Sequence, residues 1–153
     1  MVDGLSAHLQ GLDPVLRRMR TLAPKLQRSG LKAAVRKGAT VFARAARENA
    51  KQVDDPETGE SIARNIATQF SSRESKREKG VVYRVGVLGG AKLKNDPGSA
   101  PGGFTWYWRF VALGTSKVRA RDFMLPAMVN NLDRATSTVV SELERQIDKA
   151  VAQ

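Results

Sequence analysis

The sequence has no cysteine, and this absence excludes a disulfide framework and any metal site built on thiolates. It suits a protein that is made and assembled in a reducing cytosol. No stretch approaches the roughly 18 consecutive apolar residues that a membrane-spanning helix needs. The N-terminal residues MVDGLSAHLQGLDP contain an acid and no apolar run of signal-peptide length. We therefore expect a soluble protein that no signal peptide exports.

The sequence also has little of what a catalytic site requires. His8 is its only histidine, and we expect a solvated side chain there, because the residue lies in an N-terminal segment typical of a frayed end. No histidine–acid–serine set and no cysteine nucleophile is present. The glycine-rich stretches GVLGG and GSAPGG lack the residues of a phosphate-binding loop. We predict that the chain is not an enzyme and binds no cofactor.

One loop gathers acidic residues, and it is the only candidate for a metal site. Its carboxylates belong to Asp54, Asp55, Glu57 and Glu60. Such a group could hold a hard cation, but its spacing is not that of a calcium-binding loop. A solvated turn is the better interpretation, and we predict no metal site.

The chain does have the length and apolar content of a folded domain. It has 153 residues, of which 41% are hydrophobic, so we expect a single domain over residues 1–153 with a real core. Residues 1–13 and the loop 89–103 are expected to be flexible. That loop is rich in Gly, Pro, Asn and Ser and is longer than a compact domain normally needs.

Positive charge is abundant and unevenly placed. Residues 1–52 contain 11 Lys and Arg against 3 Asp and Glu, so this third carries +8 of the net charge of +11. Arg36, Arg44 and Arg47 are candidate contacts for a polyanion such as DNA, and such a contact would be weak and sequence-independent. The alternative is a solvated helix face that keeps the protein soluble.

The spacing of apolar residues predicts helices near both ends of the chain. Asp13 and Pro14 begin a short helix, and Pro24 begins a long one with an Ala- and Gly-rich stripe between residues 31 and 46. Asp122 can cap a final helix that runs to about residue 151 with 3–4 spacing. Small residues in the stripe would let the long helix lie close to a sheet or another helix.

Between these helices the sequence predicts strands. Residues 66–72 and 81–88 have strand patterns, and a charged connection joins them. Residues 105–113, TWYWRFVAL, favour a third strand, although a short helix is possible. The predicted fold class is therefore α+β, with a long N-terminal helix and a C-terminal helix packed on a small antiparallel sheet.

Most of the large aromatic side chains lie in one segment, WYWRFVALGTSKVRARDFMLPA at residues 106–127. If residues 105–113 form a strand, Trp106, Trp108 and Phe110 share one of its faces. A base-stacking surface of a single-strand binder would use such residues. We favour the alternative that these side chains form the core between the sheet and the helices.

This segment and two earlier ones resemble a family of phage proteins, the tail-completion or head–tail joining proteins of long-tailed double-stranded DNA bacteriophages. The resemblance covers roughly residues 15–150 and lies in PETGESIARNI, VYRVGV and the aromatic segment. The matching positions are Thr58, Gly59, Tyr107, Phe110, Val111, Gly114, Thr115, Phe123, Pro126 and Ala127. Ala112 and Asp122 depart from the family pattern, which commonly has Glu and Pro there, so a subunit contact through that Glu is not carried over.

The resemblance implies a virion protein of the neck or head-proximal tail end, which completes the tail through ring-like assembly in the host cytoplasm. It implies contacts with the connector, the tail terminator, the tail tube and further copies of the chain. Lys92 and Lys94 in the long loop are candidate contacts to acidic groups on a neighbour. The alternative function is a free, basic, non-enzymatic DNA-binding protein.

The matched residues also have physical roles that the sequence predicts. Gly59 and Gly114 are expected to adopt positive φ in turns, and the hydroxyls of Thr58 and Thr115 to bond nearby backbone. Phe123 is expected to anchor the start of the final helix, with Pro126 in its first turn.

Overall fold

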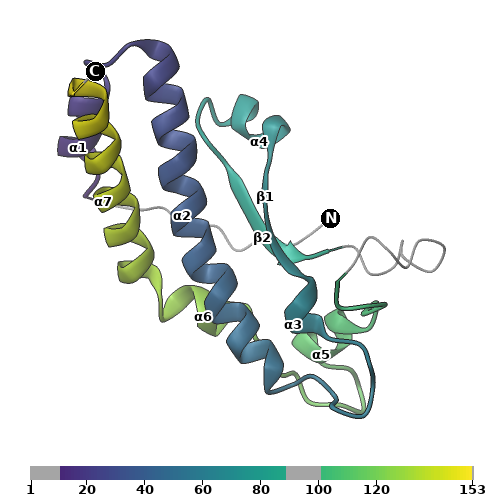
Figure 1. The fold of residues 1–153 in the computed structure, drawn as a ribbon. Coiled ribbons are helices and arrows are strands. Elements are labelled where there is room, and N and C mark those ends of the chain that lie inside the picture. Colours follow the sequence, from purple (N-terminus) through teal and green to yellow (C-terminus); the bar gives the residue numbers. More distant parts are fainter. Residues whose placement is uncertain (1–10, 89–100, 153) are drawn as a thin grey trace. The chain divides into compact units, whose positions relative to one another are not determined.

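The computed structural model of the chain describes residues 11–88 and 101–152 (Figure 1). Its elements, in chain order, are α1 (Asp13–Met19), α2 (Pro24–Lys51), α3 (Ile62–Asn65), β1 (Ile66–Phe70), α4 (Ser72–Arg77), β2 (Tyr83–Val87), α5 (Trp108–Leu113), α6 (Leu125–Val129) and α7 (Leu132–Val151). The two strands pair in one antiparallel sheet. The predicted α+β class, with long helices near both ends and a small antiparallel sheet, is confirmed.

The chain divides into two compact units, each with its own apolar cluster. Unit 1 comprises Met1–Val41, Gln69–Arg84 and Asn131–Gln153, and unit 2 comprises Phe42–Thr68 and Val85–Asn130. Helix α2 and both strands contribute residues to each unit. The single-domain organisation stays a prediction.

In unit 1, the buried side chains of α1, α2 and α7 form one cluster, and α1 lies beside α7 (Figure 1). Its buried members are Val15, Met19, Ala34, Val139, Leu143 and Ile147. Glycines let α2 approach its neighbours closely, since a Cβ on Gly38 would lie 2.6 Å from Cγ2 of Val139. The small residues of the stripe therefore serve helix packing, as their pattern predicted.

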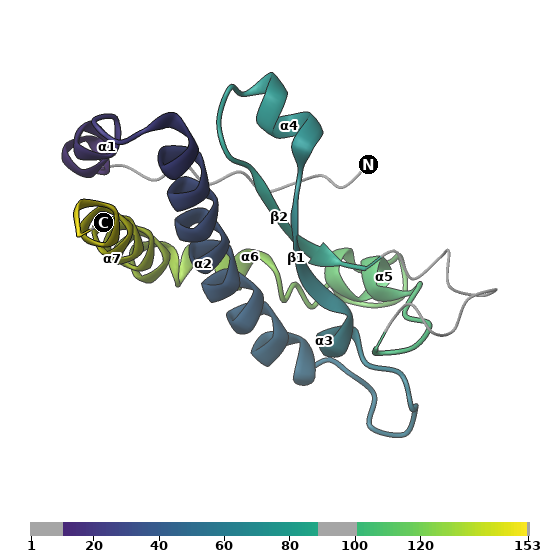
Figure 2. The same cartoon turned by 45° about the horizontal axis from the view of Figure 1, so that its top comes forward.

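The strand connection in unit 1 contains a helix that the sequence did not predict, α4 (Figure 2). The Ser71 hydroxyl caps it by accepting a hydrogen bond from the Glu74 N–H at 3.4 Å. At the same end of the sheet, the rings of Phe70 and Tyr83 meet edge to face with centroids 5.5 Å apart. The Lys32 ammonium of α2 lies 4.4 Å from the Phe70 ring centroid, a cation–π contact that links helix and sheet.

In unit 2, the core joins α2, α3, the strands and the segment around α5 and α6. Its buried members are Ala43, Ala46, Ala50, Ile62, Ala63, Ile66, Ala112, Phe123 and Ala127. Phe123 is the largest fully buried side chain of this cluster. Three alanines of α2, Ala43, Ala46 and Ala50, belong to the same cluster.

The prediction of a strand at residues 105–113 is wrong, because this segment contains the helix α5. Gly114 ends the helix with φ of +76°, and its N–H bonds the Phe110 carbonyl at 3.0 Å. Only one side of the helix packs on the core, where Ala112 is buried and Val111 half-buried. Packing and the turn override the strand preference of the aromatic residues.

The final helix is also not continuous, because α6 ends at Val129 and α7 begins at Leu132. Two asparagines separate them, and the second has φ of −120° and ψ of 12°, outside the helical region. Asparagine side chains compete with the helix for backbone hydrogen bonds. Asp122 acts as predicted at the start of α6, where its carboxylate accepts hydrogen bonds from the Met124 and Leu125 N–H groups.

Candidate functional site

A buried asparagine fixes the segment that leads into α5. The Asn65 side chain donates to the Gly103 carbonyl and the Thr105 hydroxyl, each at 2.8 Å, and accepts from the Gly102 N–H at 2.7 Å. Asn65 and Thr105 are both completely buried. These hydrogen bonds hold the backbone immediately before Trp106, so the orientation of α5 depends on them.

The acidic turn, residues 54–60, lies in the same unit and carries out a structural task. The Asp54 carboxylate accepts hydrogen bonds from the Ser61 hydroxyl at 2.8 Å, the Ile62 N–H at 2.7 Å and the Ala63 N–H at 3.2 Å. It therefore satisfies the free N–H groups at the start of α3. Within the described residues, no three His, Cys, Asp or Glu side chains are arranged to hold a metal ion.

Tyr107 lies beside the acidic turn. Burial raises the pKa of the Tyr107 hydroxyl above its ordinary value, and the negative charge of Glu60 adds to the rise. A hydrogen bond with Thr58 lowers it in part. The matched residues Thr58 and Tyr107 are therefore neighbours in the fold.

The side of α5 that faces away from the core exposes large apolar side chains. Trp106 and Phe110 are each 51% exposed, and Leu113 is 76% exposed. The rings of Trp106 and Phe110 meet edge to face with centroids 5.8 Å apart, and Leu113 follows Phe110 by three residues on the same side of the helix. We call these three residues the α5 surface. The prediction that these aromatic residues form the core is wrong for Trp106, in the turn before α5, and for Phe110, on the outer side of the helix. It holds for Trp108, which is half-buried and packs against the core of unit 2.

The α5 surface is followed by a basic turn, residues 114–121, whose backbone is hydrogen-bonded. The Thr115 N–H bonds the Val118 carbonyl and the Arg121 N–H bonds the Val111 carbonyl, each at 2.8 Å. The Thr115 hydroxyl accepts from the N–H groups of Lys117 and Val118, as its pattern predicted. Positive φ at Gly114 was predicted correctly too.

The other residues that match the family pattern have their predicted roles only in part. The Thr58 hydroxyl donates to the Asp55 carbonyl at 3.2 Å, as predicted. Gly59 does not have positive φ, and Asp55 closes the turn by accepting hydrogen bonds from the Glu57 and Thr58 N–H groups. Phe123 and Ala127 are buried in the core of unit 2, and Pro126 lies in the first turn of α6. Phe123 thus anchors α6, not the long last helix.

The three arginines predicted to contact a polyanion differ from one another. Arg36 and Arg44 are exposed on α2. Arg47 is half-buried, and its guanidinium donates two hydrogen bonds to the Ile66 carbonyl, at 3.0 and 2.7 Å. Part of its hydrogen-bonding capacity therefore serves the fold. His8, Lys92 and Lys94 lie outside the described residues.

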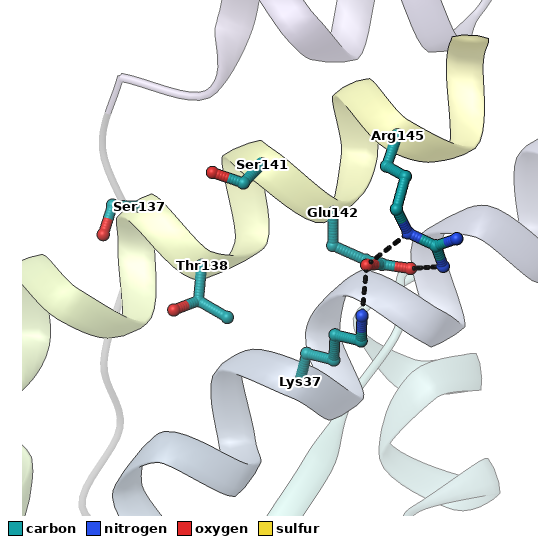
Figure 3. Close-up of a pocket in the computed structure, with 6 residues that line it drawn as sticks. All are labelled: Lys37, Ser137, Thr138, Ser141, Glu142 and Arg145. Carbon is teal, nitrogen blue, oxygen red and sulfur yellow. Dashed lines mark hydrogen bonds and ion pairs between the residues drawn. The ribbon is translucent and has the colours of Figure 1, made fainter. Parts of the chain in front are cut away.

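A second site, in unit 1, is a shallow cavity of about 320 Å³ between α2 and α7 (Figure 3). Lys37 and Arg145 converge there on Glu142, whose side chain is only 3% exposed. Hydrogen bonds from Arg145, and then from Lys37, lower the pKa of Glu142 to about 2. Ser137, Thr138 and Ser141 complete the lining. A carboxylate with so low a pKa is a weak base at neutral pH, so it does not activate these hydroxyls.

Large apolar side chains gathered on an exposed surface are typical of proteins that bind another macromolecule. Comparison with known families agrees with this class. The family described as "Bacteriophage HK97-gp10, putative tail-component" matches residues 13–114, about two thirds of the chain. The chain belongs to this family. Searches among curated proteins and among solved structures found no match.

Family membership identifies a phage tail component, which is a part of the virion and contacts other tail proteins. Because a tail component has a structural role, membership of this family argues against an enzymatic function. Among residues 11–88 and 101–152, none of the helices combines the length and the hydropathy needed to cross a membrane. The sequence did not point to Asn65 or Thr105, and it pointed to Asp54 only as a candidate cation ligand, not as the residue that caps α3.

Proposed function

We propose that this chain completes the tail at its head-proximal end and helps to join the tail to a filled head, through copies arranged in a ring. The observation that carries this proposal is the α5 surface. Phe110 and Leu113 share one side of α5, and the ring of Trp106, in the turn before the helix, meets that of Phe110. Buried hydrogen bonds hold the segment that leads into this surface. Preorganised aromatic residues of this kind are typical of the centre of a protein interface.

Burial of the α5 surface in an assembly is energetically favourable. Covering apolar area contributes about 25 cal/mol per Å², so two half-exposed rings and a leucine supply several kcal/mol when a partner covers them. The α5 surface lies within the segment that matches the family. A ring requires each copy to offer two unlike surfaces, and the α5 surface is one candidate.

In this proposal the chain acts by assembly and carries out no catalysis. Its partners are the connector, the tail terminator and the tail tube, together with neighbouring copies. It joins the virion in the host cytoplasm and remains in the neck. Lys92 and Lys94 provide additional contacts in the assembled particle. Hydrogen exchange of residues 89–103 should then be slower in the particle than in the free protein.

The proposal is tested in the phage that encodes the chain, with the gene interrupted by a stop codon. We expect filled heads and separate tails by electron microscopy, and infectious particles when purified protein is added to the extract. A Phe110→Asp, Leu113→Asp variant should fail to restore infectivity, whereas Val151→Asp should restore it, because Val151 is an exposed apolar residue outside the α5 surface. Joined, infectious particles formed without the protein would contradict the proposal.

A DNA-binding role is the second candidate, and the charge of residues 1–52 favours it. Arg36 and Arg44 are exposed and available to phosphate groups. Tight binding of duplex DNA at physiological salt would favour this role over tail completion.

A further inference from the structure

The basic turn presents cationic side chains that no ion pair within the described residues neutralises, and an exposed apolar side chain lies among them. Lys117, Arg119 and Arg121 are exposed and form no ion pair with any residue of 11–88 or 101–152. Val118 lies between two of these cations and is 58% exposed. Arg109 of α5 adds a further exposed cation nearby in sequence.

The backbone of the basic turn is fixed without help from those side chains. Its hydrogen bonds join main-chain groups and the Thr115 hydroxyl. Gly114 is required there, because a Cβ would lie 2.6 Å from the Ala120 nitrogen. A turn ordered in this way loses little conformational entropy when a partner binds it.

The acidic turn offers the opposite charge in the same unit. Residues 54–60 contain four acids and no base. The Asp54 carboxylate accepts a hydrogen bond from the Ile62 N–H of α3, and the Asp55 carboxylate accepts one from the Glu57 N–H at 2.9 Å. The carboxylates of Glu57 and Glu60 form no ion pair with a described residue. Glu57 is exposed and Glu60 half-buried.

We propose that the basic turn of one copy docks against the acidic turn of a second copy of this chain. The two turns are complementary in charge. Both belong to unit 2, and the exposed charges of neither turn form an ion pair within the described residues. Such pairs steer association and fix the register of an interface. Val118 supplies an apolar contact at the centre of the basic turn. Because the two surfaces differ, the contact is heterologous, and repeated docking generates a ring where the rotation between copies closes.

The pairing rests on the proposed function, since it names the partner that a ring-forming tail protein would use. The two are nevertheless separable. Self-association of purified protein tests the pairing, whereas head–tail joining in the phage tests the function.

The experiment uses two charge-reversal variants of the full chain. One carries Glu57→Lys and Glu60→Lys, and the other carries Lys117→Glu and Arg119→Glu. Each variant brings like charges together at the docked turns, so we expect its self-association to weaken at least about tenfold relative to the wild type. The two variants mixed, or all four substitutions in one chain, should restore association. Analytical ultracentrifugation at low and high salt measures this, and association should weaken as salt rises.

Matched controls separate local pairing from net charge. Arg64→Glu reverses an exposed cation of unit 2 outside both turns, and Glu144→Lys reverses an exposed acid of unit 1. Both should associate like the wild type. Thermal unfolding confirms that every variant is folded.

Three results would overturn the pairing. The first is a wild-type chain that stays monomeric at low salt, and the second is association that the reversals leave unchanged. The third is that each variant alone fails to associate and that mixing the two variants does not restore association. If the reversals leave self-association intact but block head–tail joining, the turns bind a different tail protein.

Discussion

The buried amide of Asn65 and the backbone N–H of Gly102 form a hydrogen bond of 2.7 Å that joins α3 to the segment leading into α5. The Gly102 carbonyl in turn accepts from the Ser61 N–H at 2.7 Å. The contact is so close that a Cβ on Gly102 would lie 2.1 Å from the Ser61 carbonyl oxygen. The α5 surface is therefore held by a backbone approach that only glycine permits.

Gly102→Ala should destabilise the protein for this reason. Overpacking of a tight site costs about 1–3 kcal/mol, and we expect a decrease of that size in the free energy of unfolding, measured with urea. Gly59→Ala is the control, because a Cβ there meets no atom within 4 Å. Equal stability of the two variants would contradict the proposed role of the close approach.

Phe123→Ala and Phe110→Ala should separate stability from assembly. Phe123 is 1% exposed, so its removal leaves a cavity and should cost about 3–5 kcal/mol. Phe110 is half-exposed on the α5 surface, and its removal should change stability by less than about 1 kcal/mol but reduce head–tail joining. Urea unfolding and the phage extract assay measure the two effects. A severe loss of stability in Phe110→Ala would mean that this ring belongs to the core after all.

Glu142 should make stability depend on pH in the acid range. Its pKa falls from an ordinary 4.5 to about 2 in the folded chain. The carboxylate therefore stabilises the fold fully above pH 4.5, and this contribution disappears as the pH falls toward 2. Since Lys37 and Arg145 are more than half exposed, we expect about 1–3 kcal/mol at neutral pH.

Comparison of the wild type with Glu142→Gln at several pH values tests this expectation. The difference in the free energy of unfolding should be largest at neutral pH and shrink below pH 4.5. Glu144→Gln, a change at an exposed position on the same helix, should give a small difference. A Glu142→Gln difference that stays constant down to pH 2 would show that the ion pairs contribute nothing.

Duplex DNA should bind weakly and without sequence preference, and binding should fade at physiological salt. Arg36→Glu with Arg44→Glu should flatten the dependence of log K on log salt, by about 0.9 for each phosphate group that the variant no longer neutralises. Fluorescence anisotropy across a salt series measures both quantities. An unchanged slope would show that these arginines do not touch phosphate.

Arg47 should behave differently from its neighbour on α2. Arg47→Met removes two hydrogen bonds to the Ile66 carbonyl and should cost about 1–3 kcal/mol of stability. Arg44→Met, at an exposed position, should leave stability within about 0.5 kcal/mol. If both variants unfold alike, the Arg47 hydrogen bonds add nothing to the fold.

Local patterns in the sequence were enough to predict the long helices, the two strands and the basic turn. The 3–4 spacing of apolar residues depends only on the helical period, and α2 begins at Pro24 as predicted. Gly114 and Thr115 act within a few residues of themselves. The resemblance to a phage tail family was likewise carried by short segments, and the family match confirmed it.

Only the tertiary structure decided which aromatic residues are buried. Aromatic residues favour strands locally, so the helix in residues 105–113 was decided by packing in unit 2 and by the helix end at Gly114. It also decided the roles of Asn65 and Glu142, whose partners lie far away in the sequence, Gly102 for one and Lys37 for the other. A local pattern has no signal for such pairs, because their hydrogen bonds form only when distant segments meet.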